Sequence, residues 1–289
     1  MDAVVSANEE AIRAWNTVLF DRFVQYRDVL IEGLGAHGDR AIALYPPRPG
    51  DRVLDIGCGF GDTTQQLADV VGPDGSAVGI DAAERFIDLA RQEAVAAGAA
   101  NVRFVVGDIQ AGTLDEHFDH AFARFGTMFF ANPVAAMRNV REMLVPGGQL
   151  CMVVWRRKLD NEWLHRAELV VKDYVEKPEE SDEPTCGPGP FSMADADTTS
   201  HILLNAGYVD VRFDRTDIPI PIGRDLDGAM SLMTALGPAG EVIRLAGEEA
   251  ERIRPEIEGA LREALAEFVR PDGVWASAST WIVTARNPA

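Results

Sequence analysis

The chain has 289 residues, of which 47% are hydrophobic and 25% are charged. This composition is typical of a globular protein and excludes a disordered, collagen-like or coiled-coil chain. Its 27 basic and 46 acidic residues give a net charge of −19, which disfavours binding to nucleic acid or to an anionic membrane surface. The length allows one large domain or two ordinary ones.

Three cysteines, Cys58, Cys151 and Cys186, lie far apart in the chain. Their spacing predicts neither a disulfide framework nor a zinc site, and it is typical of a protein in a reducing compartment. The first residues lack a basic stretch followed by an apolar one, and no run of 18 apolar residues occurs. We therefore expect a soluble, cytoplasmic protein with no membrane insertion and no metal.

The first half of the chain shows alternating helices and strands after a helical start. Apolar spacing predicts helix over residues 8–45, which ends at two prolines. The predicted strands are residues 52–56, 77–80, 102–106, 119–123 and 150–155, and the helices between them are residues 63–71, 83–97 and 133–145, the last ending at Pro146-Gly147-Gly148. This alternation predicts an α/β fold in which a parallel, doubly wound sheet has helices on both faces.

The second half has a different pattern. The predicted elements are a helix over 160–177, a proline-rich acidic loop over 178–190, a helix over 195–205, a strand over 208–213, helices over 225–269 and a final strand over 274–285. The segment between the last two strands is too long for an ordinary connection, and it carries its own apolar stripe. We expect it to form a separate helical insert.

A glycine-rich turn, Gly57-Cys58-Gly59-Phe60-Gly61, follows the first predicted strand and opens a helix. Glycines at such a place allow a sharp turn and let a ligand lie against backbone amides at a helix N-terminus. Asp81 ends the next strand, 24 residues after Gly57. An acid at that position can accept both hydroxyl groups of a ribose, so the pattern predicts a nucleoside-containing ligand.

Two ligand classes compete for this turn. A dinucleotide fingerprint would read G-x-G-x-x-G, with the pyrophosphate at the helix N-terminus. Here the spacing is G-x-G-x-G, and Asp55 and Asp62 flank the turn where the pyrophosphate would lie. Negative charge at these places favours a ligand that carries an ammonium and a sulfonium group.

The segment Val53–Gly61 resembles motif I of class I S-adenosylmethionine-dependent methyltransferases, especially the ubiquinone and menaquinone biosynthesis type. Further matches follow in order at residues 78–81, 105–109 and 144–150. The resemblance implies a Rossmann-like sheet of seven mostly parallel strands with an antiparallel edge strand. It also implies S-adenosylmethionine as methyl donor and S-adenosylhomocysteine as product.

The resemblance implies roles for particular residues. The expected cofactor-binding residues are Asp55, Gly57, Cys58, Gly59, Asp81, Ala82, Asp108, Ile109 and Arg124. Simpler interpretations exist beside these roles. Asp81 with Glu84 has the spacing of a helix capping box, Asp108 suits an ordinary turn, and Arg124 suits an exposed position.

Acceptor-binding residues are expected among the large apolar side chains that follow the strands. The candidates are Phe125, Phe129, Trp155 and Met230, all of which also suit ordinary core packing. His165 is a weak candidate for a general base. Its Glu162-x-x-His165 spacing occurs once, whereas a di-iron site would need two copies.

We predict methyl transfer to a small organic acceptor through an O, N or C nucleophile, by in-line displacement. The alternatives are a nicotinamide-dependent oxidoreductase and a catalytically silent, cofactor-binding scaffold. The expected parts are an N-terminal helical cap (1–47), a cofactor-binding core (48–156), a lid excursion with an edge strand (157–218), a helical substrate insert (219–272) and a final strand (273–289).

Overall fold

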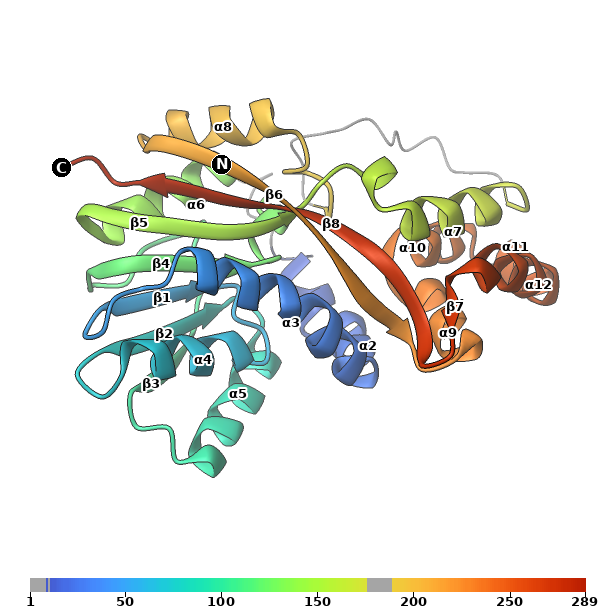
Figure 1. The fold of residues 1–289 in the computed structure, drawn as a ribbon, viewed down its shortest axis with the longest axis horizontal. Helices are drawn as coiled ribbons and strands as arrows, with labels where there is room; N and C mark the ends of the chain where they lie inside the picture. Colours follow the sequence, from blue (N-terminus) through green and yellow to red (C-terminus); the bar gives the residue numbers. More distant parts are fainter. Residues whose placement is uncertain (1–8, 10, 176–188) are drawn as a thin grey trace.

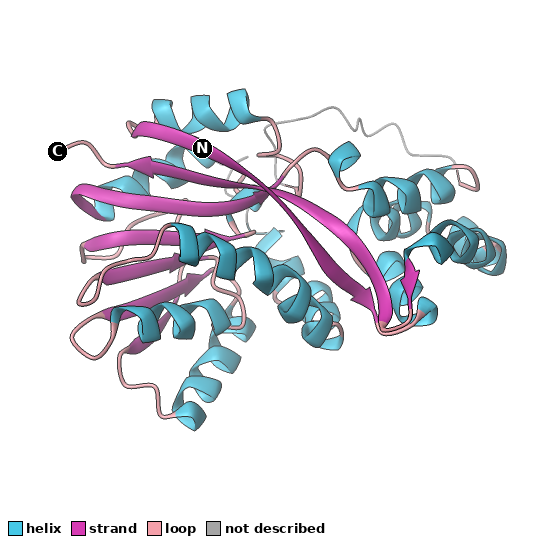
Figure 2. Ribbon diagram, in the orientation of Figure 1, coloured by secondary structure: helices cyan, strands magenta, loops and turns pink. Residues whose placement is uncertain are grey.

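The computed structural model describes residues 9, 11–175 and 189–289, and its centre is one sheet (Figures 1 and 2). The strands are β1 (Arg52–Ile56), β2 (Ser76–Asp81), β3 (Val102–Val106), β4 (Phe118–Arg124), β5 (Leu144–Trp155), β6 (Val209–Gly223), β7 (Val269–Arg270) and β8 (Gly273–Arg286). They lie in the order β3-β2-β1-β4-β5-β8-β6, and β7 pairs with β8. Strands β1 to β5 are parallel, and β8 is antiparallel to both β5 and β6.

The helices lie on both faces of the sheet and beyond one end of it (Figure 1). They are α2 (Val18–Gln25), α3 (Arg27–Leu44), α4 (Asp62–Val71), α5 (Glu84–Ala97), α6 (Pro133–Met143), α7 (Glu162–Lys172), α8 (Ala196–Asn205), α9 (Leu226–Ala235), α10 (Gly237–Ala246), α11 (Glu248–Arg252) and α12 (Arg254–Leu265). Short 3-10 helices are η1 (Thr127–Phe129), η2 (Lys158–Asp160) and η3 (Ala266–Phe268).

The central strands are buried on both faces, as the sequence predicted. Val53, Phe122 and Val153 pack in one apolar cluster with side chains of α3 and α4. Leu54 and Met152 pack on the opposite face, in a cluster that includes residues of α6 and α8. Because successive side chains of a strand point to opposite faces, one strand contributes to both clusters. The predicted doubly wound α/β fold is confirmed.

Strand β6 is much longer than predicted. It pairs with β8 from Val209 to Gly223, whereas the sequence suggested a strand only over residues 208–213. Pro219 and Pro221 lie within this strand, which is possible because β6 is the edge strand of the sheet, where proline is tolerated. The extended β6 and β8 reach past the other strands, with α9 to α12 at their far end (Figure 1). The insert therefore begins at Leu226 rather than at residue 219, and the two-residue β7 raises the predicted seven strands to eight.

Helix α6 ends, and β5 begins, earlier than predicted. Asn132 caps the helix by accepting a hydrogen bond from Ala135 N, as the sequence indicated. The helix ends at Met143 instead of at Pro146, and β5 starts at once at Leu144. A residue before proline avoids helical geometry. The freed carbonyl of Leu144 accepts a hydrogen bond of 2.7 Å from Asn287 Nδ2, which explains the early change.

The N-terminal helices contact the insert. Arg22 on α2 donates a hydrogen bond of 2.8 Å to the carbonyl of Ala235, and Tyr26 Oη donates one of 3.0 Å to the carbonyl of Ser231 on α9. Helix α7 packs against α10 and α12. No helix in the described ranges is both long and apolar enough to cross a membrane.

Asn161, just before α7, joins this helical region to the sheet. Its side chain is fully buried, and it donates a hydrogen bond of 3.1 Å to Ser279 O and accepts one of 2.7 Å from Ser279 N. Ser279 lies on β8, so this paired contact fixes the start of α7 relative to the sheet.

We expect Asn161→Ala to lower the free energy of unfolding by about 2–4 kcal/mol. The substitution leaves the buried Ser279 N–H without an acceptor, and such groups cost about 1–3 kcal/mol each. Urea unfolding followed by circular dichroism measures the change. Asn205→Ala removes an exposed asparagine and should change stability by less than about 0.5 kcal/mol. Equal effects of the two substitutions would contradict the role of Asn161.

Candidate functional site

The glycine-rich turn joins three strand ends. Gly57, Gly59 and Gly61 have φ angles of 66°, 52° and 79°, which favour glycine. The amide of Gly57 donates a hydrogen bond of 2.8 Å to the carbonyl of Ile80 at the end of β2. On the other side, a Cβ atom on Gly57 would lie only 3.0 Å from the Cα atom of Gly126, which follows β4. The turn therefore brings the ends of β1, β2 and β4 into contact.

Asp81 lies directly beside this turn. Its carboxylate accepts hydrogen bonds of 3.0 Å from Gly59 N and 2.9 Å from Ala83 N. Burial raises the pKa of Asp81, and these backbone N–H groups oppose the increase. Helix α5 starts at Glu84 with Ala83 as its N-cap, so the capping-box interpretation of Asp81 is wrong. The carboxylate bridges the turn and the start of α5 instead.

Asp55 lies underneath the turn. Its side chain is only 1% exposed, and it accepts a hydrogen bond of 2.6 Å from Thr64 Oγ1 on α4. Burial raises the pKa of Asp55 to about 7, although the Thr64 hydrogen bond and the nearby Arg124 charge act in the opposite direction. This hydrogen bond connects β1 to α4 beneath the glycine turn. A direct contact of Asp55 with a ligand stays a prediction.

The end of β3 lies next to the end of β2, at the same edge of the sheet as the glycine turn. The amide of Gly107 donates a hydrogen bond of 2.9 Å to the carbonyl of Asp81. Asp108 Oδ1 accepts one of 3.0 Å from Gln110 N, and Ile109 is buried. Asp108 and Ile109 therefore lie in the turn that follows the strand next to Asp81, where the sequence resemblance placed them.

Arg124, the last residue of β4, forms an ion pair with Asp62. Its Nη2 atom lies 2.6 Å from Asp62 Oδ2, and both side chains are largely buried. Asp62 is the first residue of α4, so the pair lies immediately after the glycine turn. A Cβ atom on Gly38 would lie 3.0 Å from Arg124 Cδ, so α3 packs closely on this arginine. The interpretation of Arg124 as a merely exposed cation is wrong.

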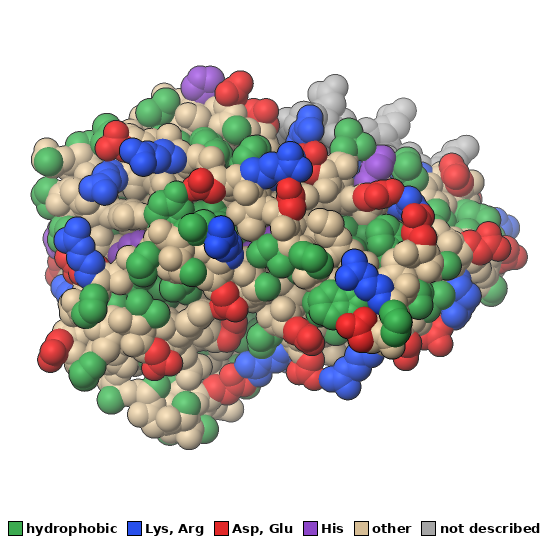
Figure 3. Space-filling view, viewed as in Figure 1, with side chains coloured by type: hydrophobic (Ala, Val, Ile, Leu, Met, Phe, Trp, Pro, Cys, Tyr) green, Lys and Arg blue, Asp and Glu red, His purple; other side chains and the backbone are tan. Residues whose placement is uncertain are grey.

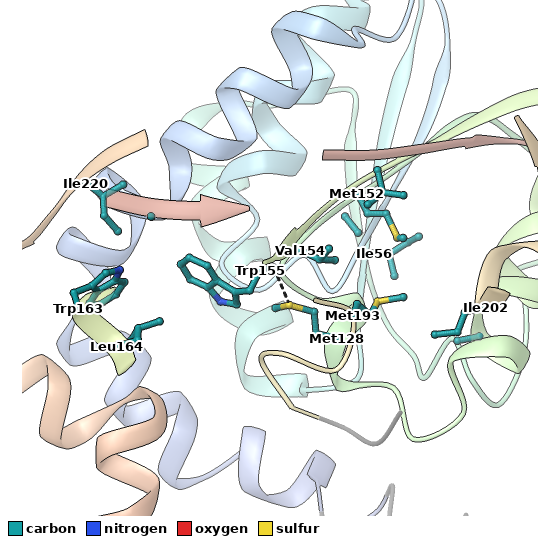
Figure 4. Packing of buried hydrophobic residues seen from close by; sticks show 14 of the residues in the cluster. Ile56, Met128, Met152, Val154, Trp155, Trp163, Leu164, Met193, Ile202 and Ile220 are labelled. Carbon is teal, nitrogen blue, oxygen red and sulfur yellow. Dashed lines mark hydrogen bonds between the residues drawn. The ribbon is translucent and has the colours of Figure 1, made fainter. Parts of the chain in front are cut away.

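Large apolar side chains follow β4 and β5 at the same edge of the sheet. The rings of Phe125 and Trp155 lie 4.7 Å apart between centroids. The backbone N–H of Trp155 donates a hydrogen bond of 3.4 Å to Met128 Sδ, marked by the dashed line in Figure 4. Trp163 on α7 also lies close to Trp155, with 6.4 Å between ring centroids. These side chains form a predominantly apolar wall next to Arg124.

The other predicted acceptor-binding residues and the predicted general base contact other parts of the structure. Phe129 contacts Trp15 of the N-terminal segment, with ring centroids 5.1 Å apart. Met230 is buried on α9 in the insert. His165 lies on α7, and its Nδ1 atom is buried without a hydrogen-bond partner. The structure brings none of these three to the glycine turn through a described contact.

Residues 47–194, just over half of the chain, match a family described as a methyltransferase domain. The chain belongs to this methyltransferase family. The match covers the whole row of strand ends from β1 to β5, so the class I methyltransferase resemblance of the sequence is confirmed.

Two curated relatives and one solved structure show how far this similarity extends. Ubiquinone/menaquinone biosynthesis C-methyltransferase UbiE of Ectopseudomonas mendocina is 37% identical over 129 residues, which are 44% of this chain and 50% of that protein. Aklanonic acid methyltransferase DauC of a Streptomyces species is 33% identical over 136 residues, 46% of this chain and 62% of that protein. A candidate methyltransferase of Bacillus halodurans has a TM-score of 0.56 at 19% identity and covers 88% of this chain and 100% of its own.

The chain thus spans about half the length of the first of these relatives. The helical insert and the last two long strands of the chain lie outside the region that matches the family. The fold comparison extends over most of the chain, and at 19% identity it supports the architecture alone.

Sequence reasoning missed an aromatic cluster that connects the N-terminal segment of the chain to the site. Trp15 contacts Phe129 and Phe86, and Phe60 of the glycine turn contacts Phe86 with ring centroids 5.0 Å apart. Arg27 lies over the Phe60 ring at 4.5 Å. The apolar spacing that predicted the N-terminal helix contained Trp15, but it did not show which residues Trp15 would contact.

The raised pKa of Asp55 predicts a specific pH dependence of stability. An unfolded aspartate releases its proton near pH 3.8, whereas folded Asp55 keeps it until about pH 7. Raising the pH through this window therefore lowers the free energy of unfolding, and from about one pH unit above the folded pKa the effect is constant. Between pH 5 and pH 8 the wild type should lose about 3 kcal/mol relative to Asp55→Asn, which has no proton to release.

Urea unfolding of both proteins at pH 5, 6, 7 and 8 measures this difference. Other titrating groups are common to the two chains and cancel in the comparison. A difference that stays constant across the four pH values would show that Asp55 ionises normally.

Proposed function

We propose that this chain transfers the methyl group of S-adenosylmethionine to a small organic acceptor. The observation that carries the proposal is the Asp81 carboxylate, which is bound by Gly59 N at the edge of the glycine turn. A Cβ atom at Gly59 would have no neighbour within 4 Å, so the space above the turn is open for a ligand. An acid beside an open backbone turn suits the two hydroxyl groups of a ribose.

The charges around the turn favour this donor over a nicotinamide dinucleotide. Asp62 begins α4, where the pyrophosphate of a dinucleotide would need the positive end of the helix dipole. Asp81 faces the same turn, and Arg124 is already engaged by Asp62. A cationic donor experiences attraction from these acids, whereas a diphosphate experiences repulsion.

The donor supplies an activated methyl group on a cationic sulfonium. The protein then has to hold the acceptor in line with that methyl group and exclude water, and positioning of this kind contributes about 7–11 kcal/mol. Asp81 orients the donor, Gly57 and Gly59 let it approach the backbone, and the side chains of Phe125 and Trp155 provide an apolar wall. In this scheme Asp108 and Ile109 contact the base of the donor.

We further propose that acceptor specificity resides in the segments around the sheet edge. Three segments lie outside the sheet and its connecting helices. They are the N-terminal helices, the excursion after β5 and the insert between β6 and β8. Residues 176–188 of the predicted lid lie outside the described residues. The hydrogen bonds from Arg22 and Tyr26 to carbonyl groups of α9 support a common covering formed by the N-terminal helices and the insert.

The reaction is proposed to take place in the cytoplasm, on a small molecule and without nucleic acid. Cys58 and Cys151 are buried and unpaired, which suits a reducing compartment. On the face shown in Figure 3, acidic and basic side chains are interspersed, with no continuous basic stripe on that face for a phosphate backbone.

Substituting Asp81 tests the donor assignment. Asp81→Ala removes charge-assisted hydrogen bonds worth about 1.5–3 kcal/mol each, so the affinity for S-adenosylhomocysteine should fall at least about tenfold. Titration calorimetry measures the dissociation constant at a temperature where both proteins are folded.

Asp88→Ala serves as the matched control, because Asp88 is an exposed acid on the outer part of α5. It should leave the affinity unchanged. Tighter binding of NADH than of S-adenosylhomocysteine by the wild type would favour the oxidoreductase alternative. Unchanged affinity in Asp81→Ala would remove the ribose role.

A further inference from the structure

Arg27, the first residue of α3, binds the side chain of Glu93 on α5. Its Nη1 and Nη2 atoms donate hydrogen bonds of 2.5 Å and 2.6 Å to the two carboxylate oxygens of Glu93. These hydrogen bonds lower the pKa of Glu93, so the pair is charged near neutral pH. A contact through two parallel hydrogen bonds has a defined geometry, and it therefore fixes the start of α3 relative to α5.

The guanidinium group of Arg27 also covers Phe60 of the glycine turn. The Cζ atom of Arg27 lies 4.5 Å from the centroid of the Phe60 ring, where the cation is attracted by the aromatic face. Phe60 is 6% exposed, and it packs in one apolar cluster with Phe20, Ala83 and Phe86. Arg27 therefore contacts the glycine turn and α5 at the same time.

Both contacts of Arg27 are close to the groups that hold Asp81. Phe60 directly follows Gly59, whose amide donates one of the two hydrogen bonds to the Asp81 carboxylate. The other comes from the amide of Ala83, which precedes α5 and packs in the same cluster as Phe60. A displacement of Phe60 or of α5 would therefore move the amides that orient Asp81.

The residue before Arg27 connects the same point of the chain to the insert. Tyr26 Oη donates its hydrogen bond of 3.0 Å to the carbonyl of Ser231 on α9. Adjacent residues thus contact the insert and α5, which fixes the junction between α2 and α3 from two directions. This junction precedes residue 47, where the match to the methyltransferase family begins, so the family match does not include Arg27.

We propose that Arg27 is a positioning residue for the methyl donor. Paired with Glu93 and stacked on Phe60, it holds the glycine turn and the start of α5 in the arrangement in which Asp81 meets the ribose. This inference rests on the proposed donor binding and adds a residue to it. A site that is already held in its bound arrangement binds more tightly, because less ordering occurs on binding. The ion pair is neutral as a whole, so it does not repel a cationic donor.

Arg52 provides a matched control with the same chemistry at the other end of β1. Its Nη2 atom lies 2.8 Å from a carboxylate oxygen of Glu116, and its Cζ atom lies 5.5 Å from the centroid of the Phe118 ring. The carboxylates of Glu93 and Glu116 are equally exposed, at 33% each. Arg52 begins β1, whereas the glycine turn follows the end of this strand.

The test compares the binding of S-adenosylhomocysteine to Arg27→Met and Arg52→Met by titration calorimetry. Methionine keeps an unbranched apolar side chain and removes the guanidinium group. Arg27→Met should weaken binding about fivefold, which corresponds to about 1 kcal/mol and is within the value of a partly exposed ion pair with a cation–π contact. Arg52→Met should bind as tightly as the wild type, because the ion pair that it loses does not contact the turn.

Glu93→Gln shows whether Arg27 acts through the ion pair, and it replaces Arg27→Met if that variant fails to fold. It should also weaken binding, and adding it to Arg27→Met should cause no further loss, because both substitutions break the same pair. Tighter binding by Glu93→Gln would show that a released Arg27 contacts the donor itself. That result would overturn the positioning role, as would equal affinities of Arg27→Met and the wild type.

Hydrogen–deuterium exchange of the free proteins tests the positioning role without any ligand. The amides of Gly59 and Ala83 should exchange faster in Arg27→Met than in the wild type, because their hydrogen bonds to Asp81 open more often. Arg52→Met should leave them unchanged. Faster exchange in a protein that does not bind S-adenosylhomocysteine would refute the donor assignment alone, and unchanged exchange in Arg27→Met would refute the positioning role.

Discussion

The contact between Gly57 and Gly126 determines how the rest of the site can be arranged. At this place the backbones that follow β1 and β4 meet so closely that a Cβ atom on Gly126 would lie 2.9 Å from the carbonyl oxygen of Ile56. The contact places the glycine turn beside Arg124 and Phe125, and the hydrogen bond from Gly57 to Ile80 places Asp81 on its other side. A side chain at either glycine would separate the glycine turn from the apolar wall formed by Phe125 and Trp155.

Charge and apolar surface divide this site into two regions. Asp55, Asp62 and Asp81 surround the turn, where Arg124 is paired with Asp62 and Arg27 lies over the ring of Phe60. Phe125, Trp155 and the aromatic side chains of the N-terminal segment lie beyond it. In the proposed reaction, the first region stabilises a cationic donor and the second excludes water from the reacting atoms. Methyl transfer needs both, because the displacement disperses charge that water would otherwise compete to solvate.

Local sequence predicted the backbone around the glycine turn well. Three features depend on residues close in the chain: the glycine turn, the acid at the end of β2 and the start of α6. Their backbone requirements are visible in the sequence as glycines, as Asp81 and as Asn132-Pro133. The length of β6 was not predictable in this way, because Pro219 and Pro221 are acceptable only on an edge strand, and the strand order decides which strand is at the edge. The close packing of α3 on Arg124 at Gly38 was not predictable either, because it depends on residues far apart in the chain.

Hydrogen–deuterium exchange with and without S-adenosylhomocysteine tests the assembled donor site most directly. Bound ligand stabilises the residues that it contacts, so amides in 57–61, 81–83 and 107–109 should exchange more slowly in the complex, while α8 on the outer face should be unchanged. This pattern would show that three separate strand ends form one donor site. Protection absent from these segments, or confined to other parts of the chain, would contradict it.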